Sequence, residues 1–134
     1  MPTVRILLVD DEALLLGLLK RHLERAGYDV VTALTAEAAL KALTGSPWVP
    51  DLLLTDETLP GMRGSELAVT LQARFPHLRG LLCSGYSLQA SALPPPLRER
   101  FSILQKPYSP PALEAAIRTL LAPRGAAAAA GPAI

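Results

Sequence analysis

Residues 52–61 read LLLTDETLPG, and this stretch decides how the rest of the chain is interpreted. Its apolar residues run together without polar alternation, which is typical of a strand buried on both faces. The run stops at two adjacent acids, Asp56 and Glu57, and a Pro-Gly pair then turns the chain. The stretch therefore predicts a buried strand, over residues 49–56, that delivers a carboxylate to the point where it emerges.

Similar apolar segments alternate with helical patterns along the chain. Strands are predicted over residues 4–9, 28–34, 77–85 and 100–105. Helices are predicted over residues 11–26, 35–45, 64–75 and 109–122, with Thr35 and Ser109 as N-caps of two of them. A further helix, over residues 87–100, is short or irregular because Pro94, Pro95 and Pro96 forbid its continuation. This alternation predicts an α/β fold, a parallel sheet covered on both faces, whose sites form at the carboxyl ends of the strands.

The first predicted helix is rich in leucine, so its buried face must be chosen by spacing. The helical period places the following residues on one stripe: Leu15, Leu18, Leu19, His22, Leu23 and Ala26. Leu14 and Leu16 fall outside this stripe. We therefore expect them on the surface, where they are candidates for contact with a protein partner.

Composition limits the function classes. A chain of 134 residues fits one domain, predicted over residues 1–121, followed by a disordered Ala/Gly/Pro-rich tail over residues 122–134. A net charge of +1 without a basic patch argues against direct nucleic-acid binding. No apolar run reaches the ~20 residues that span a bilayer, and the amino terminus lacks the features of a signal peptide. We expect a cytoplasmic protein without membrane contact, whose only cysteine, Cys83, is a buried thiol.

Five polar residues stand at the carboxyl ends of predicted strands and are expected at one edge of the sheet. They are Asp10, Asp11, Asp56, Ser84 and Lys106. Close carboxylates repel each other by about 4 kcal/mol per pair at an effective dielectric near 20, so the cluster needs a proton or a cation. Mg²⁺ prefers oxygen ligands and often joins carboxylates to a phosphate. The pattern therefore indicates phosphoryl chemistry.

Four segments together resemble the receiver domain of response regulators. They are LLVDD (residues 7–11), LLLTDETLPGMRGSEL (52–67), LLCSGYS (81–87) and ILQKPYSPPAL (103–113). The resemblance spans residues 4–121, and the last two segments are similar to receivers associated with hybrid sensor kinases. It implies a flavodoxin-like (βα)5 three-layer sandwich with the parallel strand order 2-1-3-4-5, an order that general accounts of this fold illustrate with a receiver.

The resemblance also implies roles for the clustered residues. Asp56 would accept a phosphoryl group from a phosphohistidine, and Lys106 and Ser84 would contact that group. Asp10, Asp11, Asp56 and the backbone carbonyl of Thr58 would hold Mg²⁺. The implied partners are a sensor histidine kinase or a histidine phosphotransfer protein, and a downstream protein target. The domain would then be a switch and not an enzyme, since it would catalyse only its own phosphorylation and dephosphorylation.

Some positions depart from the family pattern or tune it. Many receivers have a rotating Tyr or Phe where this chain has Ile103, so aromatic switching is in question, although Ser84 can still move. Thr58 and Tyr86 lie at positions that, in the family, tune the lifetime of the phosphorylated form. Glu57 stands where an apolar residue is common, and we expect it to be a solvated loop acid.

Two other function classes stay open at this point. One is an interaction module that uses the receiver fold without phosphorylation, which the change at Ile103 and the broken fourth helix allow. The other is a Mg²⁺-dependent phosphohydrolase of the aspartyl-phosphate type. Such enzymes usually have a second Asp two positions after the nucleophile, where this chain has Thr58.

Overall fold

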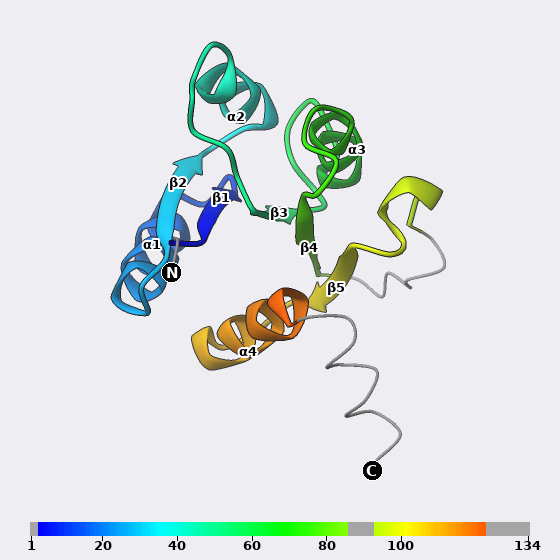
Figure 1. The fold of residues 1–134 in the computed structure, drawn as a ribbon. Helices are drawn as coiled ribbons and strands as arrows, with labels where there is room; N and C mark the ends of the chain where they lie inside the picture. The colour runs from blue at the N-terminus through cyan, green and yellow to red at the C-terminus, as the bar shows by residue number, and fades with distance from the viewer. Residues whose placement is uncertain (1–2, 86–92, 123–134) are drawn as a thin grey trace.

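The computed structural model describes residues 3–85 and 93–122, and in these residues a five-stranded parallel sheet has the order β2-β1-β3-β4-β5 (Figure 1). The strands are β1 (Arg5–Val9), β2 (Asp29–Ala33), β3 (Leu52–Asp56), β4 (Arg79–Ser84) and β5 (Phe101–Gln105). Each predicted strand is confirmed, although each is shorter than its apolar segment. The predicted strand order is confirmed as well.

Helices cover both faces of the sheet. They are α1 (Ala13–Arg25), α2 (Ala36–Leu43), α3 (Gly64–Arg74) and α4 (Pro110–Leu121). Figure 1 shows α1 and α4 on one side of the strands and α2 and α3 on the other. The two predicted caps are confirmed, because the hydroxyl of Thr35 accepts from the backbone N–H of Ala38 and that of Ser109 accepts from Ala112. The architecture is the flavodoxin-like three-layer sandwich.

The core has two parts, one on each face of the sheet. On the α1 and α4 face, Leu16, Leu19 and Leu23 pack with Leu113 and Ile117 against the strands. The predicted stripe of α1 was correct only in part: Leu19 and Leu23 are buried as predicted, but Leu16 is buried as well, Leu18 is 65% exposed and Ala26 is exposed. Leucines at positions 14, 15, 16, 18 and 19 allow several helical stripes, and the packing of α1 against the strands and α4 selects one.

The segment before β5 is irregular, as predicted, within the residues that the structure describes. A single 3₁₀ turn, η2 (Pro95–Leu97), begins after Pro94 and buries Leu97 beside Phe101. Residues 86–92 and 123–134 lie outside the described residues. The length of the predicted helix over residues 87–100 and the disorder of the tail therefore stay predictions. Among the described helices, none combines the length and the apolar composition that crossing a membrane requires.

The loop between α2 and β3 is fastened to the start of β2. The indole N–H of Trp48 donates to Oδ2 of Asp29 over 3.0 Å, and the side chain of Trp48 packs against the core of the α2 and α3 face. Trp48, the only tryptophan in the sequence, is thus placed at the amino edge of the sheet, where the parallel strands begin.

Candidate functional site

The carboxyl ends of the parallel strands bring the predicted acids and Lys106 to one edge of the sheet. Asp56, the last residue of β3, lies opposite Cys83 in β4. The backbone N–H of Asp10 donates to the carbonyl of Ala33 over 3.2 Å, which joins the ends of β1 and β2. The backbone N–H of Lys106 donates to the carbonyl of Ser84 over 2.7 Å, which joins the ends of β5 and β4.

Three carboxylates meet at this edge. One oxygen from each of Asp10, Asp11 and Asp56 lies within 4.8 Å of the other two. Asp10 is buried, Asp56 is partly buried and Asp11 is exposed, so the cluster is enclosed by the protein on one side and open on the side of Asp11. An oxygen-only donor set with an open side suits Mg²⁺, which keeps several of its waters when bound. The residues present therefore fit a magnesium ion.

Lys106 supplies a single cation to the cluster. Its Nζ lies 3.1 Å from Oδ2 of Asp56 and 3.4 Å from Oδ2 of Asp10. Burial raises the pKa of the Asp56 carboxyl above its ordinary value, and Lys106 only partly opposes that shift. Burial acts to lower the pKa of Lys106, but Asp56 and Asp10 outweigh it, so that the pKa of Lys106 is raised. Three carboxylates facing one ammonium leave two excess negative charges, which a divalent cation would neutralise.

The remaining predicted site residues are placed less centrally. Ser84 is buried at the end of β4, and its backbone carbonyl accepts from the backbone N–H of Lys106. Thr58 is exposed in the loop between Asp56 and α3, while Tyr86 lies outside the described residues. Ile103 is partly buried and packs against the core on the α2 and α3 face, so a branched aliphatic side chain occupies the expected position of the rotating aromatic.

Comparison with known proteins decides the family. Residues 6–118 match the family described as response regulator receiver domain. The chain belongs to this family. It is 44% identical over 68 residues to the alkaline phosphatase synthesis transcriptional regulatory protein PhoP of Bacillus subtilis (strain 168), covering 51% of this chain and 28% of that protein. It is 31% identical over 117 residues to the sensor kinase CckA of Brucella abortus (strain 2308), covering 87% of this chain and 12% of that protein.

Solved structures agree with the family assignment. A CheY-like response regulator receiver domain protein from Methanospirillum hungatei JF-1 is similar with a TM-score of 0.75 and 30% identity, over 87% of this chain and 92% of that chain. The chain spans less than a third of the length of the two curated relatives, which are a transcriptional regulator and a sensor kinase. What is shared is thus the receiver domain of two-component signalling.

Glu57 of this receiver domain is not the solvated acid that the sequence suggested. Its side chain and backbone are 6% exposed. Oε1 of Glu57 accepts from the backbone N–H of Ser65 over 2.7 Å, and Oε2 accepts from the hydroxyl of Ser65 over 2.9 Å. The expectation failed because both donors lie eight residues further on, at the start of α3. The sequence did contain a signal for this contact. Arg63 precedes α3, and its side chain has no acceptor atom for the N–H groups at the start of the helix.

Two further residues beside the receiver's acid cluster influence each other's pKa, which the sequence did not indicate. The predicted burial of Cys83 is confirmed, and burial raises the pKa of its thiol to about 12. Burial likewise raises the pKa of the Tyr108 phenol, and the neighbouring Cys83 thiol raises it further. Both side chains are therefore neutral at physiological pH, and they add no charge next to Asp56.

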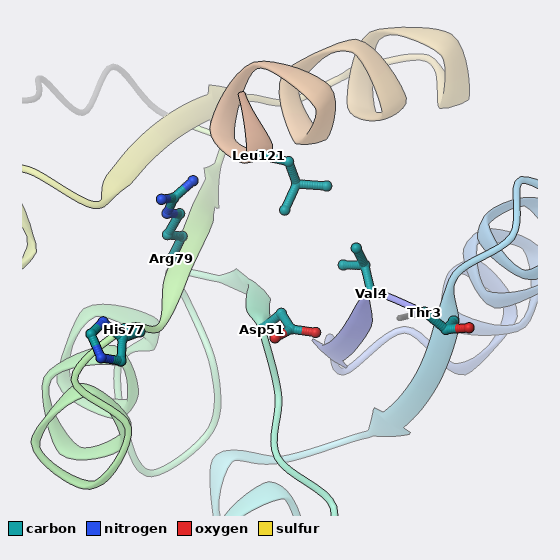
Figure 2. Close-up of a pocket in the computed structure, with 6 residues that line it drawn as sticks. All are labelled: Thr3, Val4, Asp51, His77, Arg79 and Leu121. Atoms are coloured by element: carbon teal, nitrogen blue, oxygen red, sulfur yellow. The ribbon is translucent and has the colours of Figure 1, made fainter. Parts of the chain in front are cut away.

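A hollow at the opposite edge of the receiver's sheet contrasts with this site (Figure 2). It encloses about 310 Å³, and Asp51, His77 and Arg79 are among its lining residues. Oδ2 of Asp51 accepts from the backbone N–H of Arg5 over 2.8 Å, and Arg79 donates to the carbonyl of Leu120 over 2.6 Å. Two of its charged side chains thus bind the backbone, which is a structural role.

Proposed function

We propose that this receiver domain accepts a phosphoryl group on Asp56 and acts as a switch in a two-component or phosphorelay system. The observation that supports this is the position of the Asp56 carboxylate, which belongs to the acid cluster and also contacts Lys106. Asp56 is partly buried, so it remains reachable for a donor on the open side. The domain would have no separate substrate and would not be a conventional enzyme.

The proposed reaction is a transfer between two side chains. An oxygen of the Asp56 carboxylate attacks the phosphorus of a phosphohistidine, a new P–O bond forms and the P–N bond breaks. The leaving imidazole keeps the electron pair and takes a proton from solvent. Lys106 already lies 3.1 Å from Oδ2 of Asp56, where it can contact the phosphoryl oxygens as their charge develops. Ser84 is proposed to hydrogen-bond the same group.

The metal requirement follows from the charge of the cluster. Asp10, Asp11 and Asp56, with the backbone carbonyl of Thr58, are proposed to hold Mg²⁺. When bound, the ion would neutralise the carboxylates and the incoming phosphoryl oxygens, which otherwise repel each other. Without a cation, a phosphoryl dianion would approach a cluster that already has excess negative charge.

A surface next to the site fits a helical partner that presents the phosphohistidine. Leu14 and Leu18 of α1 are 88% and 65% exposed. A hollow of about 460 Å³ adjoins Lys106, and its lining includes Leu15, Leu19 and Tyr108. Exposed leucines beside a reactive centre favour docking of an apolar helix face. We therefore propose a sensor histidine kinase or histidine phosphotransfer protein as the donor, acting in the cytoplasm, and a protein as the downstream target.

Incubation with acetyl phosphate and Mg²⁺, followed by intact-mass spectrometry, tests the proposal. The wild type should gain one phosphoryl group that hydroxylamine removes, as expected for an acyl phosphate. Asp56→Asn should gain none, because an amide cannot form that bond, while the distant Asp51→Asn should be phosphorylated like the wild type. Equal phosphorylation of wild type and Asp56→Asn, or of neither, would refute the assignment.

The phosphorylation assay, together with a binding assay and a phosphatase assay, separates the two alternatives. A phosphorylation-independent interaction module would take up no phosphoryl group yet retain its partner binding. A phosphohydrolase would release phosphate from a generic phosphomonoester in many turnovers, and Asp56→Ala would abolish that release. We expect no such turnover, because Thr58 stands where those enzymes usually have a second Asp.

A further inference from the structure

The start of α3 needs an acceptor that its own N-cap residue cannot provide. The first N–H groups of a helix have no partner within the helix, and an N-cap side chain usually accepts from one of them. Thr35 and Ser109 do this for α2 and α4. The residue before α3 is Arg63, whose side chain contains only donors. The N–H groups of α3 must therefore find an acceptor elsewhere.

Glu57 provides that acceptor from the far side of the loop. Its carbonyl oxygen accepts from the N–H of Gly64 over 3.0 Å, and its carboxylate accepts from both the N–H and the hydroxyl of Ser65. A carboxylate at the N-terminus of a helix is also favoured by the helix dipole. The three bonds close the loop of residues 58–63 at its base, which a local cap would not do.

The contact reaches the peptide that contains Asp56. A Cβ atom added to Gly64 would collide with the carbonyl oxygen of Asp56, so the helix lies directly against this peptide. On the other side, the N–H of Glu57 donates to the carbonyl of Cys83 over 2.8 Å. The peptide between Asp56 and Glu57 is thus held between β4 and the start of α3, and the Glu57 carboxylate fastens the α3 side.

We propose that Glu57 is a positioning residue for the Asp56 site. By tying the start of α3 to the end of β3, it fixes the backbone of the intervening loop, including the carbonyl of Thr58. This inference rests on the proposed function, in which that carbonyl and the Asp56 carboxylate hold Mg²⁺. Glu57 itself is committed to Ser65, and it acts on the metal only through the loop.

The test must separate positioning of the site from simple capping of a helix. Glu57→Met removes both side-chain hydrogen bonds at similar size, and Glu57→Gln keeps an acceptor for the N–H of Ser65. Arg63→Ser gives α3 a local cap of its own. The double variant Glu57→Met/Arg63→Ser therefore restores the cap but not the tie across the loop, and Arg63→Ser alone is the matched control.

Three properties are measured for each variant by NMR and chemical denaturation: the Kd for Mg²⁺ alone, amide exchange in residues 58–66, and the denaturation midpoint. For Glu57→Met we expect a Kd raised about tenfold, as for the loss of a residue that orients a metal ligand, with faster exchange and a lower midpoint. The double variant should recover the midpoint but keep the raised Kd. Glu57→Gln should stay within about twofold of wild type in Kd, as a rescue by the conservative change.

Two results would overturn the inference. One is a wild-type Kd and wild-type loop exchange in Glu57→Met, and the other is recovery of both properties in the double variant, which would make Glu57 a cap only. If Glu57→Met does not fold, Glu57→Gln/Ser65→Ala is used, and a wild-type Kd there likewise overturns it. A wild type that binds no Mg²⁺ refutes the proposed function instead, while amide exchange still reports whether Glu57 holds the loop.

Discussion

The two edges of the sheet have similar residues and opposite behaviour. At the amino edge, Asp51 accepts a backbone N–H and Arg79 donates to a backbone carbonyl, so each charge is satisfied by the fold. At the carboxyl edge, Asp10 and Asp56 share one ammonium group with each other, and Asp11 adds a third carboxylate. Charged residues alone therefore do not mark a functional site. A functional site is indicated where like charges lie close together and have too few partners of opposite charge.

The largest expected difference between the edges concerns Lys106. In Lys106→Met the phosphoryl oxygens lose their fixed cation, and we expect phosphorylation by acetyl phosphate to slow by about a hundredfold. Arg79→Met removes a cation from the other edge and should leave the rate unchanged. Both rates are measured by intact-mass spectrometry over time. Equal rates for the two variants would show that the edges do not differ as we describe.

Mg²⁺ should stabilise the domain through one edge only. At a concentration one hundred times its Kd, the ion raises the free energy of unfolding by about 2.7 kcal/mol if it binds only the folded state. Asp51→Asn should show the same increase, because Asp51 belongs to the other edge. Asp11→Asn should lose most of it. Denaturation with and without Mg²⁺ measures the difference, and an increase that survives in Asp11→Asn would contradict the metal assignment.

The raised pKa of Asp56 predicts that, without Mg²⁺, the free energy of unfolding depends on pH. The folded domain holds the Asp56 proton more tightly than the unfolded chain, whose value is near 3.8. The stabilising contribution is thus complete below that pH and is lost as the pH rises through the folded value. Without Mg²⁺, Asp56→Asn should be more stable than wild type at neutral pH, and this advantage should vanish as the pH approaches 3.8. Denaturation in chelator at several pH values tests this, and a constant advantage would contradict it.

The smallest expected effect concerns the thiol beneath the carboxyl edge. Burial raises the pKa of Cys83 to about 12, so almost no thiolate is present at pH 8. A thiol reagent should react with the native domain far more slowly than with the unfolded chain. Absorbance of the released chromophore gives both rates. Rapid reaction of the native domain would show that Cys83 is more open than its burial indicates.

Sequence could predict the features that depend on the ends of strands. Asp10, Asp56 and Lys106 each follow an apolar run, and parallel strands that end together must bring such residues to one edge. Thr35 and Ser109 were found for a similar reason, since an N-cap bonds to residues only three positions away. Local spacing therefore decided both the sheet edge and these two helix starts.

Sequence could not predict the features that depend on packing between elements. Leu16 and Leu18 both fit helical stripes, and the choice between them is made by packing against other elements, including α4, which is distant in the chain. Glu57 resembles any loop acid until Ser65 is brought against it across the loop. The mutual influence of Cys83 and Tyr108 on their pKa values likewise depends on β4 lying beside the segment after β5. In each case the deciding partner belongs to another element.

The position of Trp48 has a practical consequence for spectroscopy. The only intrinsic indole of this chain is hydrogen-bonded to Asp29 at the amino edge, away from the acid cluster. Its fluorescence should therefore follow global unfolding with little interference from metal or phosphoryl occupancy. Trp48 fluorescence can thus report folding. An extrinsic fluorophore near Leu14 would report independently on events at the carboxyl edge.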